Sequence, residues 1–390
     1  MTATDIDLLS IELRKHFDWH GARINFLANF LIALFKVKTV NFTQLATAFS
    51  CKKTTNIDSH YKRIQRFFRF FVIDEYEHGK AIASFIFPGK KWILTLDRTN
   101  WLYGEKNINI LTLGLAHKGM AFLLLYDFLT KKGNSNTEER KRILLKFLSI
   151  FGGALINYLT ADREFIGKDW FEFLLEQKIS FRIRIRKTDK IANSQGEMVE
   201  AKVLFQNLKV NEHQVLEQKR SVWGHLLYVA ALRLPNGELL IVVSPDCPET
   251  ILHDYAVRWE IETLFGCLKS RGFNLEDTHV TKPERIKKMM AVLAIALCWS
   301  HKLGEVLNDV KPIAIKKHGR RAKSIFRTGF DSIRSILLNI SERFEDYLNI
   351  IKLFMTSTVK INKQKSALPL EYNNGLSVNI STGNYVGCNS

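Results

Sequence analysis

The sequence is poor in the residues that build disulfide frameworks and zinc sites. It has five cysteines in 390 residues, at positions 51, 247, 267, 298 and 388, and no two of them form a C-x-x-C pair. This scatter argues against a disulfide framework and against a structural zinc site. It fits the reducing environment of the cytosol, so we expect a cytoplasmic protein.

Several other signatures are missing. There is no P-loop, no G-x-G-x-x-G and no H-E-x-x-H, so no organic cofactor is indicated. Asp5, Asp7 and Glu12 occupy the first turns, where a secretory signal would be apolar. The apolar runs 24–35 and 289–299 are too short to span a bilayer. We expect both to form buried helices and expect no membrane partner.

Positive charge is abundant. Lysine and arginine number 57 against 39 aspartates and glutamates, which gives a formal charge of +18. Because this charge is spread through segments with folded-looking patterns, it favours a nucleic acid over a membrane surface as the partner. At 390 residues the chain also exceeds the size at which one core keeps growing, so we expect two or three structural units.

The N-terminal region, residues 1–88, has helical patterns throughout. Residues 5–38 read as helical, Asn41 or Thr43 is placed to cap a short helix, and a further helix is predicted at 59–71. The last helix has an apolar face and a basic face of Lys62, Arg63, Arg66 and Arg69. These elements predict a helix-turn-helix that contacts DNA, although ordinary helical bundles contain the same elements with solvated arginines.

Residues 89–187 alternate between strand and helix patterns. A strand is predicted to end at Asp97, and strands at 108–115 and 121–129 follow it. The helix at 137–151 is expected to turn residues 138–142 toward water. A strand at 154–161 then ends at Asp162, a helix follows at 168–177, and in the strand 181–186 we expect the three arginines to point outward.

The remaining chain contains one stretch that combines charge with helical periodicity. Residues 255–269 are predicted to form one helix, in which Tyr255, Arg258, Glu262 and Lys269 share a narrow arc. Short strand-like pieces at 188–245 precede it and indicate a β-rich insertion. We place the second part of the core at 246–310, a basic helical region at 311–361 and an aperiodic tail at 362–390.

This order of elements predicts an α/β fold with a ribonuclease-H-like core, a mixed sheet flanked by helices. In open α/β sheets reactive groups gather at strand ends, where Asp97 and Asp162 are expected. With Glu262 they would form an acidic triad, and three adjacent carboxylates repel one another unless cations neutralise them. Such a triad suits two Mg²⁺ ions, with Mn²⁺ as the alternative, and metal-dependent phosphoryl transfer.

The boxes D97RTNW and D162REF, together with Tyr255-x2-Arg258-x3-Glu262-x6-Lys269, resemble the DDE transposases of bacterial insertion sequences that carry the Y-R-E-K signature. By pattern the resemblance runs from about residue 40 to 327. It implies a cut-and-paste transposase that cleaves the inverted terminal repeats of its element, forms a DNA hairpin and transfers the strand to target DNA.

The resemblance also implies residue roles. Asp97, Asp162 and Glu262 would hold the metals, and Tyr255, Arg258 and Lys269 would grip phosphates of double-stranded transposon ends. We add Arg163, in the second box, to the predicted DNA contacts. Trp223 or Trp259 would stack on a flipped base. Pairing two DNA ends implies a homodimer, and a bacterial origin implies association with the nucleoid when DNA is bound.

Two other functions stay open from the sequence. One is a nuclease of the same fold that cuts DNA without strand transfer. The other is a catalytically silent DNA-binding protein descended from such an enzyme, although such a protein is expected to have lost an acidic ligand.

Overall fold

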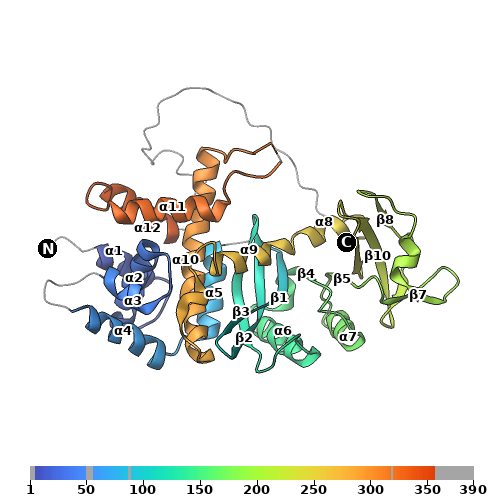
Figure 1. Ribbon diagram of the computed structural model, residues 1–390, viewed down its shortest axis with the longest axis horizontal. Coiled ribbons are helices and arrows are strands. Elements are labelled where there is room, and N and C mark those ends of the chain that lie inside the picture. The colour runs from blue at the N-terminus through green and yellow to red at the C-terminus, as the bar shows by residue number, and fades with distance from the viewer. Residues whose placement is uncertain (1–4, 50–55, 87–88, 318, 356–390) are drawn as a thin grey trace.

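The computed structural model describes residues 5–49, 56–86, 89–317 and 319–355. Figure 1 shows helices at one end, a β-rich part at the other, and a sheet covered by helices between them. The predicted tail at 362–390 lies outside the described residues. The α/β class with a mixed sheet flanked by helices is confirmed.

A mixed sheet runs through the middle of the molecule. Its core strands lie in the order β3-β2-β1-β4-β5. Strands β1 (Trp92–Tyr103), β2 (Lys106–His117) and β3 (Met120–Phe128) form an antiparallel meander. Strands β4 (Ile156–Ala161) and β5 (Phe181–Ile185) continue it in parallel with β1. This is the strand order of a ribonuclease-H-like core, as the sequence predicts.

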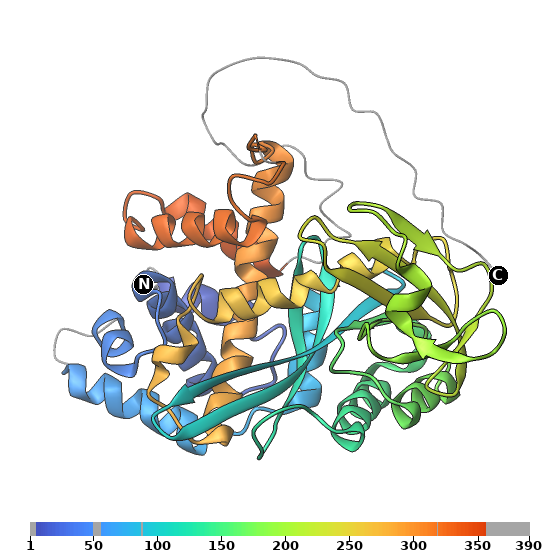
Figure 2. The same ribbon diagram turned by 45° about the vertical axis from the view of Figure 1, so that its right-hand side comes forward.

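Strand β1 is longer than predicted, which changes the position of Asp97. The pairing of β1 with β4 ends at Leu96 and Ala161, whereas its pairing with β2 continues to Tyr103. Asp97 therefore lies in the middle of a strand and not at its end, although it is level with the end of β4. Beyond it β1 and β2 form a two-stranded arm, and Figure 2 shows this arm reaching toward the helical part.

Helices cover both sides of this core. Helices α6 (Thr137–Phe151) and α7 (Lys168–Glu176) lie below the sheet in Figure 1, and α8 (Ile251–Ala256) and α9 (Trp259–Leu268) lie above it. Asn136 and Glu139 form a capping box at the start of α6, which fixes the predicted beginning of that helix.

The N-terminal helices, apart from the fifth, form one layer with the C-terminal helices. The N-terminal helices are α1 (Asp5–Leu13), α2 (Gly21–Val37), α3 (Phe42–Ala48), α4 (Ile57–Phe70) and α5 (Glu75–Ile86). Asn41 caps α3, one of the two predicted possibilities. Helix α11 (Ile325–Leu338) packs on α2, and α12 (Phe344–Met355) packs on α1. The chain therefore returns from the sheet to its beginning.

Helix α10 (Pro283–Val310) connects this helical layer with the sheet, because it packs against α2, α4, α5, α11, α12 and β3. Figure 2 shows it passing between the two parts. It is long and apolar enough to cross a membrane, and α2 and α3 together also pass that test across a bend of 104°. However, 83% of the apolar window of α10 is buried inside the protein, as expected for a core helix.

The β-rich insertion continues the core sheet. It contains β6 (Lys190–Ala192), β7 (Met198–Glu200), β8 (His213–Val215), β9 (Arg220–Val222), β10 (His225–Arg233) and β11 (Leu239–Ser244). Strand β11 pairs with β5, and β10 pairs with β11. Not all of the insertion predicted as strand-like at 188–245 is strand, because a 3₁₀ helix occupies Ala201–Phe205.

The crossing of α10 and α11 depends on two glycines. A Cβ atom at Gly329 would overlap the carbonyl oxygen of Ser300, and one at Gly304 would overlap that of Ile325. The two helix backbones therefore touch directly. Backbone contacts of this kind leave no side chain that can move away, so the helices must separate to admit even a methyl group.

We predict that Gly329→Ala destabilises the protein by at least about 2 kcal/mol, the range of overpacked cores. Thermal unfolding measures the effect. Gly79→Ala is the matched control, because Gly79 is also helical but its Cβ would meet nothing closer than 3.5 Å. Equal melting temperatures for the two variants would contradict the proposed backbone contact.

Candidate active site

The three predicted acids converge on one buried guanidinium. Asp97 lies in β1, Asp162 follows β4, and Glu262 lies in α9. Arg258 places Nη1 3.7 Å from Oδ2 of Asp97 and Nη2 2.7 Å from Oε1 of Glu262. It also interacts electrostatically with Asp162. Its side chain is only 4% exposed, so these carboxylates supply the countercharge that a buried cation needs.

Arg258 reaches this position because the predicted helix 255–269 is broken. Helix α8 ends at Ala256 and α9 begins at Trp259. Between them the amides of Val257 and Arg258 donate to carbonyls three residues earlier, not four. Such tight turns rotate the chain relative to a continuous α-helix. The prediction of one helix with a shared arc is therefore wrong.

Helix α8 is held against the sheet by Arg182. Its Nε donates to Asp254 at 3.1 Å, and its Nη1 donates to Asp246 at 2.8 Å. The expectation that all three arginines of the predicted strand 181–186 point outward is wrong for Arg182, which is buried because α8 covers that face of β5. The anchored helix carries Tyr255, whose hydroxyl donates to Asp162 at 3.3 Å.

The carboxyl group of Asp97 has an unusual environment. Burial is the largest influence on it and raises its pKa to about 7, and the nearby acids Glu164 and Asp162 add to the rise. The backbone amide of Arg98 and the charge of Arg258 oppose it. A carboxyl group in this state needs more positive charge than Arg258 alone supplies in order to ionise fully at neutral pH.

Two arginines that were not among the predicted site residues hold the loop after Asp162. Arg140 is buried and donates to the carbonyl oxygens of Glu164 at 2.8 Å and Ile166 at 3.3 Å. It was expected to face water, but the loop covers it. Arg98 binds both carboxylate oxygens of Glu164, each at 3.3 Å. Arg98 lies in the D97RTNW box and Glu164 in the D162REF box. Their positions next to the two aspartates could have indicated that they belong to the site.

The other predicted contacts are spread more widely. The ammonium group of Lys269 lies 2.9 Å from Glu276 and donates to the carbonyl oxygen of Asn100, near the arm and away from Glu262. Trp259 is 60% exposed and its ring lies 4.8 Å from the guanidinium carbon of Arg258, beside the acids. Trp223 is 37% exposed in the turn between β9 and β10 of the insertion.

The basic face of α4 is smaller than predicted. Lys62 and Arg69 are exposed, and with Arg66 and Arg285 they line a groove of about 310 Å³ between α4 and the start of α10. Arg63 instead donates to Asn25 on α2 at 3.2 Å and lies over the ring of Phe26. It packs within the helical layer, so the exposed basic face has three members.

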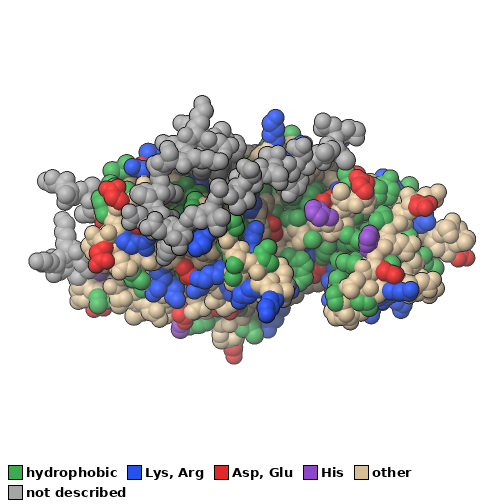
Figure 3. Space-filling model, turned by 90° about the horizontal axis from the view of Figure 1, so that it is seen from above, with side chains coloured by type: hydrophobic (Ala, Val, Ile, Leu, Met, Phe, Trp, Pro, Cys, Tyr) green, Lys and Arg blue, Asp and Glu red, His purple; other side chains and the backbone are tan. Residues whose placement is uncertain are grey.

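Positive charge also covers part of the face seen from above in Figure 1. Figure 3 shows lysine and arginine side chains gathered across the left and middle of this face, with fewer over the β-rich end. Arg163, the remaining predicted contact, follows Asp162 directly, and its guanidinium lies 3.7 Å from Glu238. It faces the insertion and not the acids.

The family profile described as the transposase DDE domain matches residues 89–299, more than half of the chain. The chain belongs to this transposase family. The matched region runs from just before β1 into α10 and includes all three acids. The broader part of the sequence-based resemblance, that to DDE transposases, is therefore confirmed.

Comparison with solved structures finds a likeness to a piggyBac transposase synaptic complex with hairpin DNA. The TM-score is 0.42 and the identity is 13%, over 90% of this chain and 82% of that one. No curated protein sequence matches the chain.

Members of this transposase family use divalent metal ions. The donor set here fits such ions chemically, because its ligands are carboxylate oxygens that converge on one positive charge. Among the described residues, however, no three acidic, histidine or cysteine side chains lie close enough together to hold one ion. Arg258 stands between the acids, so the positive charge of metal ions would replace or supplement that of its guanidinium.

We predict that Arg258→Met lowers the stability of the metal-free transposase by about 3 kcal/mol, because removing one partner of a buried ion pair leaves the others uncompensated. Millimolar MgCl₂ should restore much of this loss by binding the native state. Thermal unfolding with EDTA or with MgCl₂ measures both effects.

The matched control is Arg140→Met, which removes a buried arginine that binds carbonyl oxygens. This variant should lose stability without recovery in MgCl₂. Equal recovery of both variants, or of neither, would show that Arg258 is not the countercharge of a metal site.

Proposed function

We propose that this protein is a cut-and-paste transposase of a bacterial insertion sequence, of the type with the Y-R-E-K signature. It cleaves DNA at the terminal inverted repeats of its element and transfers the freed 3′-hydroxyl to target DNA through a hairpin intermediate. The membership of the transposase DDE-domain family supports this proposal at the level of the reaction class.

The observation that carries the proposal is the convergence of Asp97, Asp162 and Glu262 on Arg258. The three acids come from distant parts of the sequence, and the fold places Arg258 against Asp97 and Glu262 and within electrostatic reach of Asp162. Asp162 also lies 3.9 Å from Arg184. Burying an arginine among carboxylates contributes little net stability compared with apolar packing. Such an arrangement at the level where β4 ends is therefore better explained by catalysis than by structure.

In this proposal Asp97, Asp162 and Glu262 hold two Mg²⁺ ions, or Mn²⁺ in their place. Bound divalent ions activate the attacking oxygen and stabilise the leaving oxygen of a phosphodiester. Tyr255 orients Asp162 through its hydrogen bond. Arg258 holds Asp97 and Glu262 together and would be placed to bind a DNA phosphate beside them.

Double-stranded DNA would extend from the acids along the β1–β2 arm to the exposed face of α4. The tip of the arm is fixed near this face, because the hydroxyl of Tyr103 lies 2.9 Å from Nδ1 of His279. His279 and Arg285 line one pocket with Tyr61 and Gln65 of α4. Lys62, Arg66 and Arg69 would contact the phosphate backbone there, and Lys269 would contact it nearer the acids.

Other parts of the proposal concern assembly. We propose a division into a DNA-binding region at 1–88, a core at 89–187 and 246–310 interrupted by the insertion at 188–245, and a basic helical region at 311–361. The active form would be a homodimer that pairs two transposon ends, located in the cytoplasm and on the nucleoid. Trp259, which is exposed beside the acids, suits stacking on a flipped base, with Trp223 as the alternative.

A donor plasmid that carries the gene with its flanking DNA tests the proposed activity. Purified protein and MgCl₂ should release a linear element with hairpin ends and join it to a second plasmid, as seen on denaturing and native gels. Cleavage without joined product would favour a nuclease. End binding without any metal-dependent cleavage would favour a catalytically silent DNA-binding protein.

We predict that Glu262→Gln abolishes cleavage, by a factor of at least about 10³, while DNA binding is retained. The amide keeps the size of the side chain but loses the charge that a metal ligand needs. The control Glu284→Gln removes an exposed carboxylate at the start of α10 and should cleave normally. Persistent Mg²⁺-dependent nicking by Glu262→Gln would refute the assignment of this carboxylate.

A further inference from the structure

A second concentration of charge lies beside the acids, in a pocket between the core and the insertion. The pocket has a volume of about 840 Å³, within the range of ligand-binding pockets. Six cationic side chains line it against a single carboxylate, that of Glu238. The cations are Arg163, Arg184, Arg186, Lys187, Lys202 and Arg233. We call this the basic pocket.

The cations of the basic pocket are not equally available. The guanidinium of Arg233 donates to the carbonyl oxygens of Leu208, Phe205 and Gly237, so it holds the walls together. Lys202 pairs with Glu200 at 2.6 Å. Arg186 and Lys187 are exposed, and among the described residues neither lies within ion-pair distance of a carboxylate, although the charge of Arg186 acts on the nearby carboxyl group of Asp189. These two side chains leave positive charge open to a ligand.

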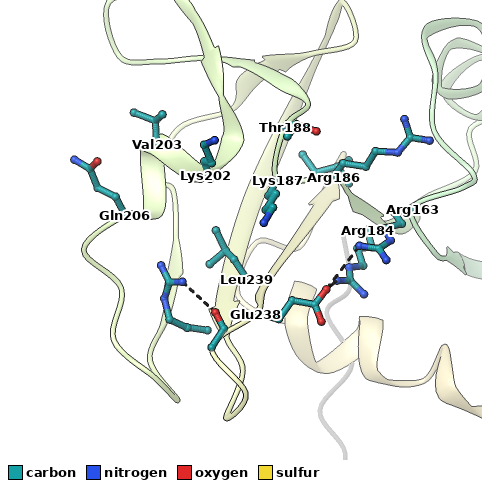
Figure 4. Close-up of a pocket in the computed structure, with 13 residues that line it drawn as sticks. Arg163, Arg184, Arg186, Lys187, Thr188, Lys202, Val203, Gln206, Glu238 and Leu239 are labelled. Atoms are coloured by element: carbon teal, nitrogen blue, oxygen red, sulfur yellow. Dashed lines mark hydrogen bonds and ion pairs between the residues drawn. The ribbon is translucent and has the colours of Figure 1, made fainter.

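The remaining two cations are held by Glu238. Its carboxylate binds Arg184 and lies 3.7 Å from Arg163. Figure 4 shows Glu238 extending toward these two arginines, which lie on the side of the pocket away from Lys202 and Gln206. Arg184 also lies 3.9 Å from Asp162, so the basic pocket is joined to the catalytic acids through one guanidinium.

Glu238 lies in a tight turn at the rim of the basic pocket. It is the last residue of the turn between β10 and β11, where Gly237 has a φ of +81°. Its side chain is 43% exposed, whereas that of Arg184 is 15% exposed. Arg184 is therefore fixed to the wall, whereas Glu238 and Arg163, whose side chain is 54% exposed, lie at the rim. Release of Glu238 to water would uncover two arginines without rearranging the core.

Because a carboxylate between two arginines has the charge and the oxygen geometry of a phosphate, we propose that Glu238 holds the place of a DNA phosphate. A single strand that leaves the catalytic acids would enter the basic pocket. Its phosphates would replace the carboxylate of Glu238 as the partner of Arg184 and Arg163, and would also bind Arg186 and Lys187 further along the pocket. This inference rests on the proposed function for the identity of the ligand.

The test measures DNA binding without catalysis. A fluorescein-labelled 12-nucleotide single strand is titrated with the full chain in EDTA, and fluorescence anisotropy gives Kd across a series of salt concentrations. Glu238→Gln should bind the strand about three- to tenfold more tightly, since each partly exposed ion pair that it abolishes competes by up to about fivefold. The slope of log K against log salt should steepen by roughly 0.7 for each additional phosphate that the variant neutralises.

The matched control is Glu217→Gln, which removes an exposed carboxylate from the same insertion outside the pocket. It changes the net charge equally and should leave Kd within about twofold, because an exposed charge away from the bound strand contributes little. The double variant Arg186→Gln/Lys187→Gln alters two exposed side chains and should weaken binding several-fold while its melting temperature stays unchanged.

Equal Kd values for Glu238→Gln, Glu217→Gln and the wild type would overturn the inference. The inference would also be overturned if Glu238→Gln tightened the binding of tripolyphosphate, measured by its competition with the labelled strand, but did not tighten the binding of the DNA strand. These outcomes differ from a failure of the proposed function. If the protein cleaves transposon ends normally but Glu238→Gln leaves Kd unchanged, only the inference about the basic pocket is disproved. If the predicted change in Kd is seen without any cleavage, only the proposed activity is disproved.

Discussion

The ion pairs of Arg258 with Asp97 and Glu262 determine much of what surrounds them. Carboxylates from a strand, a loop and a helix cannot be held close together in a partly buried place without positive charge among them. Arg258 supplies that charge, and with 4% of its side chain exposed it can do so only because the chain breaks between α8 and α9. The arrangement fits a site prepared for metal ions, in which a protein cation balances the acids beforehand.

The surrounding structure keeps this arrangement in place from several sides. Arg182 anchors α8 through Asp254, and Arg140 holds the loop that follows Asp162. On the far side of α9 the carboxylate of Glu260 accepts from the amide of Gly119 in the turn between β2 and β3, at 2.7 Å. The same turn is fixed to α10, since Nε2 of His117 lies 3.0 Å from Glu305. The helix that carries Glu262 is therefore attached to the core of the protein and not to a loose surface.

The sequence was sufficient for the fold class, and it singled out three acids whose role as metal ligands stays a prediction. Apolar runs followed by Asp97 and Asp162, and the spacing of the Y-R-E-K stretch, predicted the strand order and the three carboxylates. The alternating pattern of β5 wrongly predicted that Arg182 is exposed. That prediction assumes that water covers the outer face of the strand, whereas α8 covers it. The same assumption failed for Arg140. The break before Trp259 depends on distant partners of Asp254 and Arg258, which local helix propensity does not contain. The link of Glu238 to Arg184 and Asp162 likewise joins three regions of sequence, so no local pattern reveals it.

We propose that Asp97, Asp162 and Glu262 bind divalent ions as a unit. Titration of the protein with Mn²⁺ in the presence of duplex DNA, with free Mn²⁺ followed by electron paramagnetic resonance, tests this most directly. The account predicts two bound ions per chain for the wild type and none at comparable Mn²⁺ concentration when Asp97, Asp162 and Glu262 are replaced together by asparagine, asparagine and glutamine. The same number of bound ions in that triple variant would contradict it.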